Sequence, residues 1–172
     1  MGISGLRRYL NNATKDEIIQ DIVKLFKENK NVQEYYRLKF DPVSDDIIKK
    51  YKKIIQNEFF PDRGFGKFRL SVARNSISDY KKSGGPPGGV VELMLYYVEN
   101  CLDFTDTYGD INENFYNSTV NMYEKAAILA TKNNLIEEYR KNFKKILDMA
   151  LNISIGWGLQ ENIEEIYDEY FG

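Results

Sequence analysis

The sequence predicts an all-α fold of about eight or nine helices in a single domain over residues 1–172. Two observations lead to this prediction. Apolar residues recur every three or four positions along most of the chain, and no two segments alternate as paired strands would. With 42% apolar residues, the chain can also bury one sizeable core. We expect antiparallel helical hairpins, with an irregular α-solenoid as the alternative arrangement.

Four amphipathic segments predict four helices before Pro61. Thr14 and Glu17 form a capping box, in which each side chain satisfies a backbone amide at the start of the second helix. Pro42 disfavours helical backbone at the residue before it and therefore ends the third. Ser44 can cap the fourth. The four segments are Ile3–Leu10, Thr14–Asn29, Val32–Phe40 and Ser44–Phe60.

The segment 68–82 fits two patterns. Its apolar positions alternate as in a strand up to Val72, whereas those from Leu70 to Tyr80 recur as on a helix. We favour the helix because its pattern persists longer. The run SGGPPGG at residues 83–89 is expected to be a flexible loop. Four more helices are expected over Val90–Tyr108, Phe115–Lys132, Leu135–Leu151 and Leu159–Phe171.

Charge is divided unevenly about this loop. Residues 1–85 carry 18 Lys and Arg against 11 Asp and Glu, a net charge of +7. Residues 86–172 carry 6 against 15, a net charge of −9. This asymmetry between a basic half and an acidic half indicates faces for different partners, or attraction between the halves within or between molecules.

Histidine is absent and Cys101 is the only cysteine. The sequence therefore lacks a histidine general base, the Ser-His-Asp and Cys-His nucleophile systems, and zinc sites built from Cys or His. It implies no cofactor and no catalytic residue, and a binding protein is favoured over an enzyme. The single cysteine and the lack of an apolar run of signal-peptide or bilayer length predict a cytoplasmic protein without membrane association.

Five carboxylates at spacings of 7, 4, 3 and 4 residues would share one stripe of the helix that begins at Val90, and they are Glu92, Glu99, Asp103, Asp106 and Asp110. Paired carboxylates on helices can hold Mg²⁺, so a metal-dependent phosphohydrolase is one open alternative. The apolar residues of the same helix centre on its opposite side. This favours a solvated or partner-binding acidic face that holds no metal.

The sequence RGFGKF at residues 63–68 superficially matches an RNA-binding motif, but Lys67 stands where that motif needs an aromatic residue. We therefore expect a connection between helices, anchored to the core by its aromatic residues. Cations lie among aromatic residues across the basic region 49–82, which leaves nucleic-acid or phosphate binding as the second alternative. The candidate residues for binding an anion or a partner are Arg63, Lys67, Arg69, Arg74 and Trp157.

Two of these candidates have specific expectations. On a helix, Arg74 lies about 40° from Leu70 and about 60° from Ile77, at the edge of the core. A cation there is expected to pair with a carboxylate or a bound anion, unless its head reaches water. Trp157 stands between two glycines and is expected to be a packing anchor, with ligand stacking as the alternative.

The strings RGFGKFRLSVARNSISDYKK, LYYVENCLDFTDTYGDI, FYNS, MYEKA, IGWG and IYDEYF resemble an uncharacterised bacterial family known only as a domain of unknown function. The resemblance covers nearly the whole chain and implies a single small helical domain in a bacterial cytoplasm. It implies no activity, cofactor or catalytic residue. From the sequence we expect a non-enzymatic helical scaffold or interaction module that binds another protein through charged faces bearing aromatic residues.

Overall fold

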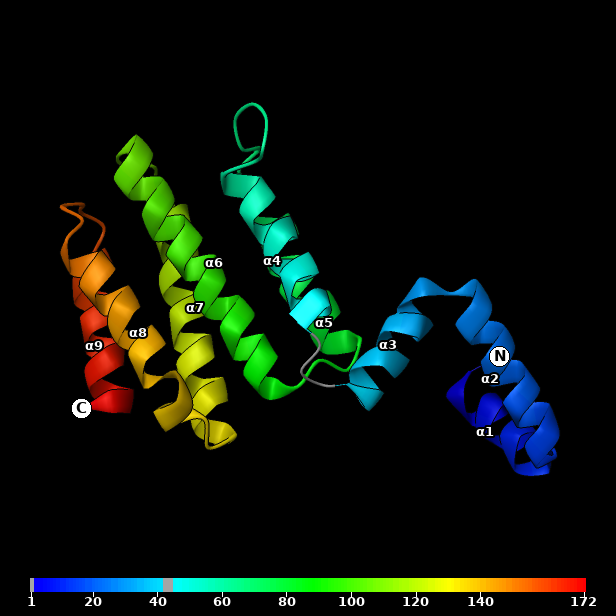
Figure 1. Ribbon diagram of the computed structural model, residues 1–172. Helices are drawn as coiled ribbons and strands as arrows, with labels where there is room; N and C mark the ends of the chain where they lie inside the picture. Colours follow the sequence, from blue (N-terminus) through cyan, green and yellow to red (C-terminus); the bar gives the residue numbers. More distant parts are fainter. Residues whose placement is uncertain (1, 42–44) are drawn as a thin grey trace.

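The computed structural model describes residues 2–41 and 45–172, and within these ranges it contains nine α-helices and no strand (Figure 1). The all-α prediction is confirmed. Over the same ranges, no helix combines the length and the apolar character that a bilayer span requires. The helices are α1 (Ile3–Asn12), α2 (Lys15–Glu28), α3 (Lys30–Phe40), α4 (Asp45–Phe59), α5 (Leu70–Lys82), α6 (Pro87–Tyr108), α7 (Glu113–Lys132), α8 (Ile136–Leu151) and α9 (Leu159–Phe171).

Helices α4 to α9 form the body of the molecule. They are arranged as three antiparallel pairs, α4–α5, α6–α7 and α8–α9, that stack side by side (Figure 1). Each pair covers an apolar face of the next, as in a short and irregular α-solenoid. The central helix α6 contacts α4, α5, α7 and α8, so it is packed from several directions.

The core is centred on α6 because this helix carries apolar residues on more than one face. Val91, Leu93, Tyr97, Val98 and Cys101 are completely buried within it. Beside this helix lies an aromatic cluster, in which the rings of α4, α6, α7 and the α4–α5 connection contact one another. Its members include Phe59, Phe68, Phe104 and Phe115.

The segment that fitted both strand and helix is helical from Leu70, so the favoured helix is confirmed. Phe68 lies before it, with a φ of 61°, and its ring stacks on Phe104 at 4.7 Å between centroids. Gly66 lies directly against the backbone of Glu58 and Phe59, where a Cβ would overlap two carbonyl oxygens. The connection is therefore fixed to the end of α4 and to the core, as expected.

The expected loop 83–89 is too long, because α6 begins at Pro87. Proline suits the first position of a helix, where its missing amide hydrogen is not needed. Gly85 and Gly89 lie against the ring of Tyr80, and a Cβ at either position would overlap that ring. Gly85 and Gly89 are therefore required for close packing on Tyr80, a tertiary contact that composition alone does not reveal.

Helices α1, α2 and α3 extend to one side of the body as an N-terminal arm, which we define as residues 2–41 (Figure 1). The predicted capping box is confirmed: the Glu17 amide donates to the Thr14 hydroxyl at 3.3 Å, and the Thr14 amide donates to the Glu17 carboxylate at 2.8 Å. The predicted cap at Ser44 lies outside the described residues. Neither α1 nor α2 contains a buried residue.

Candidate interaction surface

Large hydrophobic side chains are exposed mainly on the arm. Over residues 2–41 and 45–172, sixteen such side chains are exposed, and eleven of them belong to the arm. The eleven are Ile3, Leu6, Tyr9, Leu10, Ile19, Ile22, Val23, Leu25, Phe26, Tyr35 and Phe40. Monomeric proteins rarely gather so much apolar surface in one place, so the arm is the main candidate for binding.

Helices α1 and α2 form a hairpin joined at Ala13 and Thr14. The Tyr9 hydroxyl donates a hydrogen bond to the Asp21 carboxylate at 2.8 Å and ties the two helices together. Both helices are amphipathic, and α3 packs on part of the apolar face of α2 through Tyr36 and Phe26. Most of the large apolar side chains of the two helices nevertheless keep 37–74% of their surface exposed. The hairpin therefore presents apolar side chains from two adjacent helices to solvent.

A groove of about 860 Å³ lies between α2, α3 and the start of α4. The rings of Phe26 and Tyr36 meet edge to face at 6.1 Å between centroids, and Tyr36 stacks on Phe40 at the same distance. Ile22 and Val23 extend the apolar wall. Charges of both signs also line the groove, namely Lys27, Arg37, Asp41 and Asp46. Such a groove suits an amphipathic helix, which places apolar side chains inside and charged ones at the edge.

Helix α3 attaches the arm to the body. Leu38 is buried, and the Glu34 carboxylate accepts hydrogen bonds from Lys50 and Tyr51 of α4. Burial raises the pKa of the Tyr51 phenol, and its hydrogen bond to Glu34 raises it further, so the phenol stays protonated and donates at neutral pH. These contacts join α3, one wall of the groove, to α4 of the body.

The predicted basic residues Arg63, Lys67 and Arg69 come together with Phe65 around a shallow groove of about 330 Å³. The Arg69 guanidinium is engaged by Glu58 through hydrogen bonds of 3.0 and 2.7 Å. These bonds lower the pKa of the Glu58 carboxyl against the opposing effect of its burial. Arg69 is thus a structural partner of a buried carboxylate. Phe65 is not the core anchor that we expected, since it is 86% exposed at the tip of the loop.

Arg74 lies outside this group and does not have the expected carboxylate partner. Its guanidinium is exposed and donates a hydrogen bond to the Ser118 hydroxyl at 2.7 Å. That hydroxyl lies 2.8 Å from the phenol oxygen of the buried Tyr97. The helical prediction for this segment is correct. The Arg74 guanidinium nevertheless remains in contact with water, so it needs no carboxylate and a neutral hydroxyl is enough to satisfy it.

Trp157 connects two loops at one end of the body. Its indole nitrogen donates to both carboxylate oxygens of Asp110, at 3.0 and 3.2 Å, and its side chain is half exposed. Its φ of 64° lies in the left-handed region, which costs a residue with a side chain about 1–2 kcal/mol. The hydrogen bond joins the α8–α9 connection to the α6–α7 connection. Trp157 thus has a packing role, and its partner Asp110 is one of the five predicted acidic residues.

The five predicted carboxylates do not form one solvated stripe. Glu92 and Glu99 lie between helices, where Glu92 pairs with Lys52 of α4 at 2.6 Å and Glu99 pairs with Lys145 of α8. The expectation is wrong for these two because α4 and α8 both pack on α6. The remaining three, Asp103, Asp106 and Asp110, are exposed. In residues 2–41 and 45–172, no group of three or more carboxylate or thiol side chains is placed to hold a metal ion.

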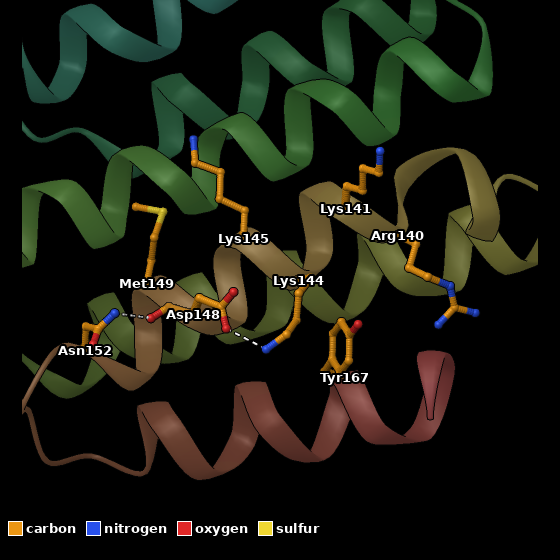
Figure 2. Close-up of a pocket in the computed structure, with 8 residues that line it drawn as sticks. All are labelled: Arg140, Lys141, Lys144, Lys145, Asp148, Met149, Asn152 and Tyr167. Atoms are coloured by element: carbon orange, nitrogen blue, oxygen red, sulfur yellow. Dashed lines mark hydrogen bonds and ion pairs between the residues drawn. The ribbon is translucent and has the colours of Figure 1, made fainter.

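A row of cations on α8 was missed by sequence reasoning. Arg140, Lys141, Lys144 and Lys145 line an open groove of about 580 Å³ beside Tyr167 of α9 (Figure 2). Three of them have carboxylate partners: Arg140 pairs with Glu137 at 2.8 Å, Lys144 with Asp148 at 2.5 Å, and Lys145 with Glu99. The run RKNFKK inside the acidic half was the available signal. Only the Lys145–Glu99 pair joins α8 to another helix, since the other two pairs lie within α8. The three carboxylates offset the positive charge of the row, which makes it a poor anion site.

Comparison with known proteins gives one match. The profile of DUF6155, a family of unknown function, matches residues 1–171. This confirms the resemblance to a family of unknown function. No curated protein and no solved structure matches the chain.

Proposed function

The chain belongs to the DUF6155 family of unknown function, and we propose that it is a non-enzymatic helical scaffold that binds a protein helix through its N-terminal arm. One observation carries the proposal: α1 and α2 are amphipathic, yet neither contains a buried residue. We place the protein in the cytoplasm of a bacterium, because a single buried cysteine suits a reducing compartment.

Exposed amphipathic helices of this length need a partner to be stable. Isolated helices shorter than about 12–15 residues are marginal in water, and α1 and α2 have 10 and 14 residues. Most of the stability of a short helix comes from burying its apolar face. A partner that covers the arm would bury these faces and the groove beside Phe26 together.

The ion pairs of the body favour this proposal over nucleic-acid binding. Ten Lys and Arg residues lie in the basic region 49–82. Six of the ten pair with carboxylates, namely Lys49, Lys50, Lys52, Lys53, Arg69 and Lys82. Each carboxylate reduces the positive potential that would attract a phosphate backbone.

In-cell photocrosslinking tests the proposal. A benzophenone amino acid replaces Phe26 in the arm or, as the control, Tyr108 in the body; the two rings are 40% and 50% exposed. The proposal predicts a crosslinked protein product from position 26 and none from position 108. Absence of product at position 26, or equal products at both positions, contradicts binding through the arm.

A further inference from the structure

We infer that the protein covering the arm is a second copy of this chain, so that two arms pack through their apolar faces into a homodimer. The inference rests on the proposed function and names the partner of the same surface. Two α1–α2 hairpins that meet in this way would form a four-helix arrangement, a common solution for amphipathic helices with short connections.

The exposed area fits a stable dimer. Eight large side chains of α1 and α2 that carry no polar group each leave between 37% and 74% of their surface in water. They are Ile3, Leu6, Leu10, Ile19, Ile22, Val23, Leu25 and Phe26. Taken together, they expose on the order of 700 Å² per copy, above the roughly 300–600 Å² of the largest patch on a typical monomer. Complete burial of this surface in both copies would give an upper limit of roughly 1,400 Å², within the range of about 1,200–2,000 Å² for stable specific interfaces.

The charge of the arm also permits self-association. Residues 2–41 carry eight Lys and Arg against six Asp and Glu. Both signs occur on α2 and α3, whereas α1 carries only Arg7 and Arg8. Two arms of net charge +2 repel each other only weakly at physiological salt. A two-fold dimer uses the same surface on both chains, and it is the commonest form of oligomer among soluble proteins.

Sedimentation velocity of the purified full chain tests the dimer with a matched pair of substitutions. Ile19 on α2 and Ile128 on α7 are both 46% exposed, so Ile19→Glu and Ile128→Glu make the same chemical change on the arm and on the body. Neither residue is buried, and circular dichroism verifies that each variant stays helical. Leu25→Glu and Leu151→Glu, at exposed positions of the arm and the body, form a second pair.

We expect the wild type and Ile128→Glu to sediment at twice the chain mass of 20.1 kDa. We expect Ile19→Glu and Leu25→Glu to raise the dissociation constant at least about tenfold, because the dimer would bury one carboxylate from each copy. A wild type that stays monomeric up to about 100 µM overturns the inference. A dimer that survives both arm substitutions also overturns it.

The two proposals fail in different ways. If the purified chain is monomeric but crosslinks from position 26 to a different protein in cells, the dimer is wrong and the proposed function stands. If no protein crosslinks from position 26, the proposed function is wrong as well.

Discussion

Replacing Gly89 by alanine tests how tightly the start of α6 packs on Tyr80. A Cβ at this position would overlap the Tyr80 hydroxyl and would lie 2.9 Å from Cζ and 3.0 Å from Cε1. The ring has little room to move, since Tyr80 is 1% exposed and also contacts Gly85 and the ring of Tyr51. Overpacking of this kind costs about 1–3 kcal/mol, against a gain of up to about 1 kcal/mol from replacing glycine in a helix.

We therefore expect Gly89→Ala to lower the free energy of unfolding by about 1–2 kcal/mol. At about 2–4 °C per kcal/mol for a chain of this size, the melting temperature falls by roughly 2–8 °C. Gly88→Ala is the matched control on the same helix, where the nearest group is the Tyr139 hydroxyl at 3.2 Å, the far end of a side chain. It should be nearly neutral, because the gain in helix propensity offsets a small displacement of this hydroxyl, which donates to the Gly88 carbonyl at 3.0 Å.

Urea denaturation followed by circular dichroism measures both variants. Tyr80→Phe removes the atom nearest to the new Cβ, so the double variant with Gly89→Ala should lose less stability than the two single changes added together. Equal stability of Gly89→Ala and Gly88→Ala would refute the packing that we assign to Tyr80.

Three further predictions follow from the ion pairs and the arm. The pKa of Glu58 is lowered in the folded state, so its pair with Arg69 stabilises the fold above the ordinary glutamate pKa of about 4.3 and is lost as pH falls through the folded value. Arg69→Ala should therefore have a lower melting temperature than the wild type at pH 7, and the two melting temperatures should converge at acid pH. A difference in melting temperature that does not depend on pH would contradict this role of Glu58. Arg74→Ala should change the free energy of unfolding by less than about 1 kcal/mol in urea denaturation, because Arg74 is exposed and the Ser118 hydroxyl keeps its hydrogen bond with Tyr97. A loss of about 3 kcal/mol would indicate a buried charge pair. Raising the salt from about 0.15 M to about 1 M should leave the dimer dissociation constant nearly unchanged, because the interface is apolar; strong weakening in sedimentation would instead show association through the charged halves.

Local signals predicted the helices well. The capping box at Thr14 and Glu17, and the helical spacing after Leu70, depend on neighbours in the sequence, and both are found in the structure. Signals that depend on tertiary contacts were less informative. The glycines at 85 and 89 suggested flexibility, whereas they are required by the buried ring of Tyr80.

The candidate site shows the same limit. The spacing of the carboxylates on α6 gave their angular positions but not the helices α4 and α8 that pack beside Glu92 and Glu99. The angular position of Arg74 likewise did not reveal Ser118, which is 44 residues away. Periodicity identified α2 as amphipathic, but it could not show that most of its apolar side chains remain about half exposed, because that depends on where the rest of the chain packs.

Hydrogen exchange in the arm tests the central claim most directly. If a second copy covers α1 and α2, the amides of residues 15–28 should exchange more slowly as the protein concentration rises from about 1 to about 100 µM. The protection should persist in Ile128→Glu and disappear in Ile19→Glu. Rapid exchange over residues 15–28 that is the same in all three proteins at every concentration would contradict a covered arm.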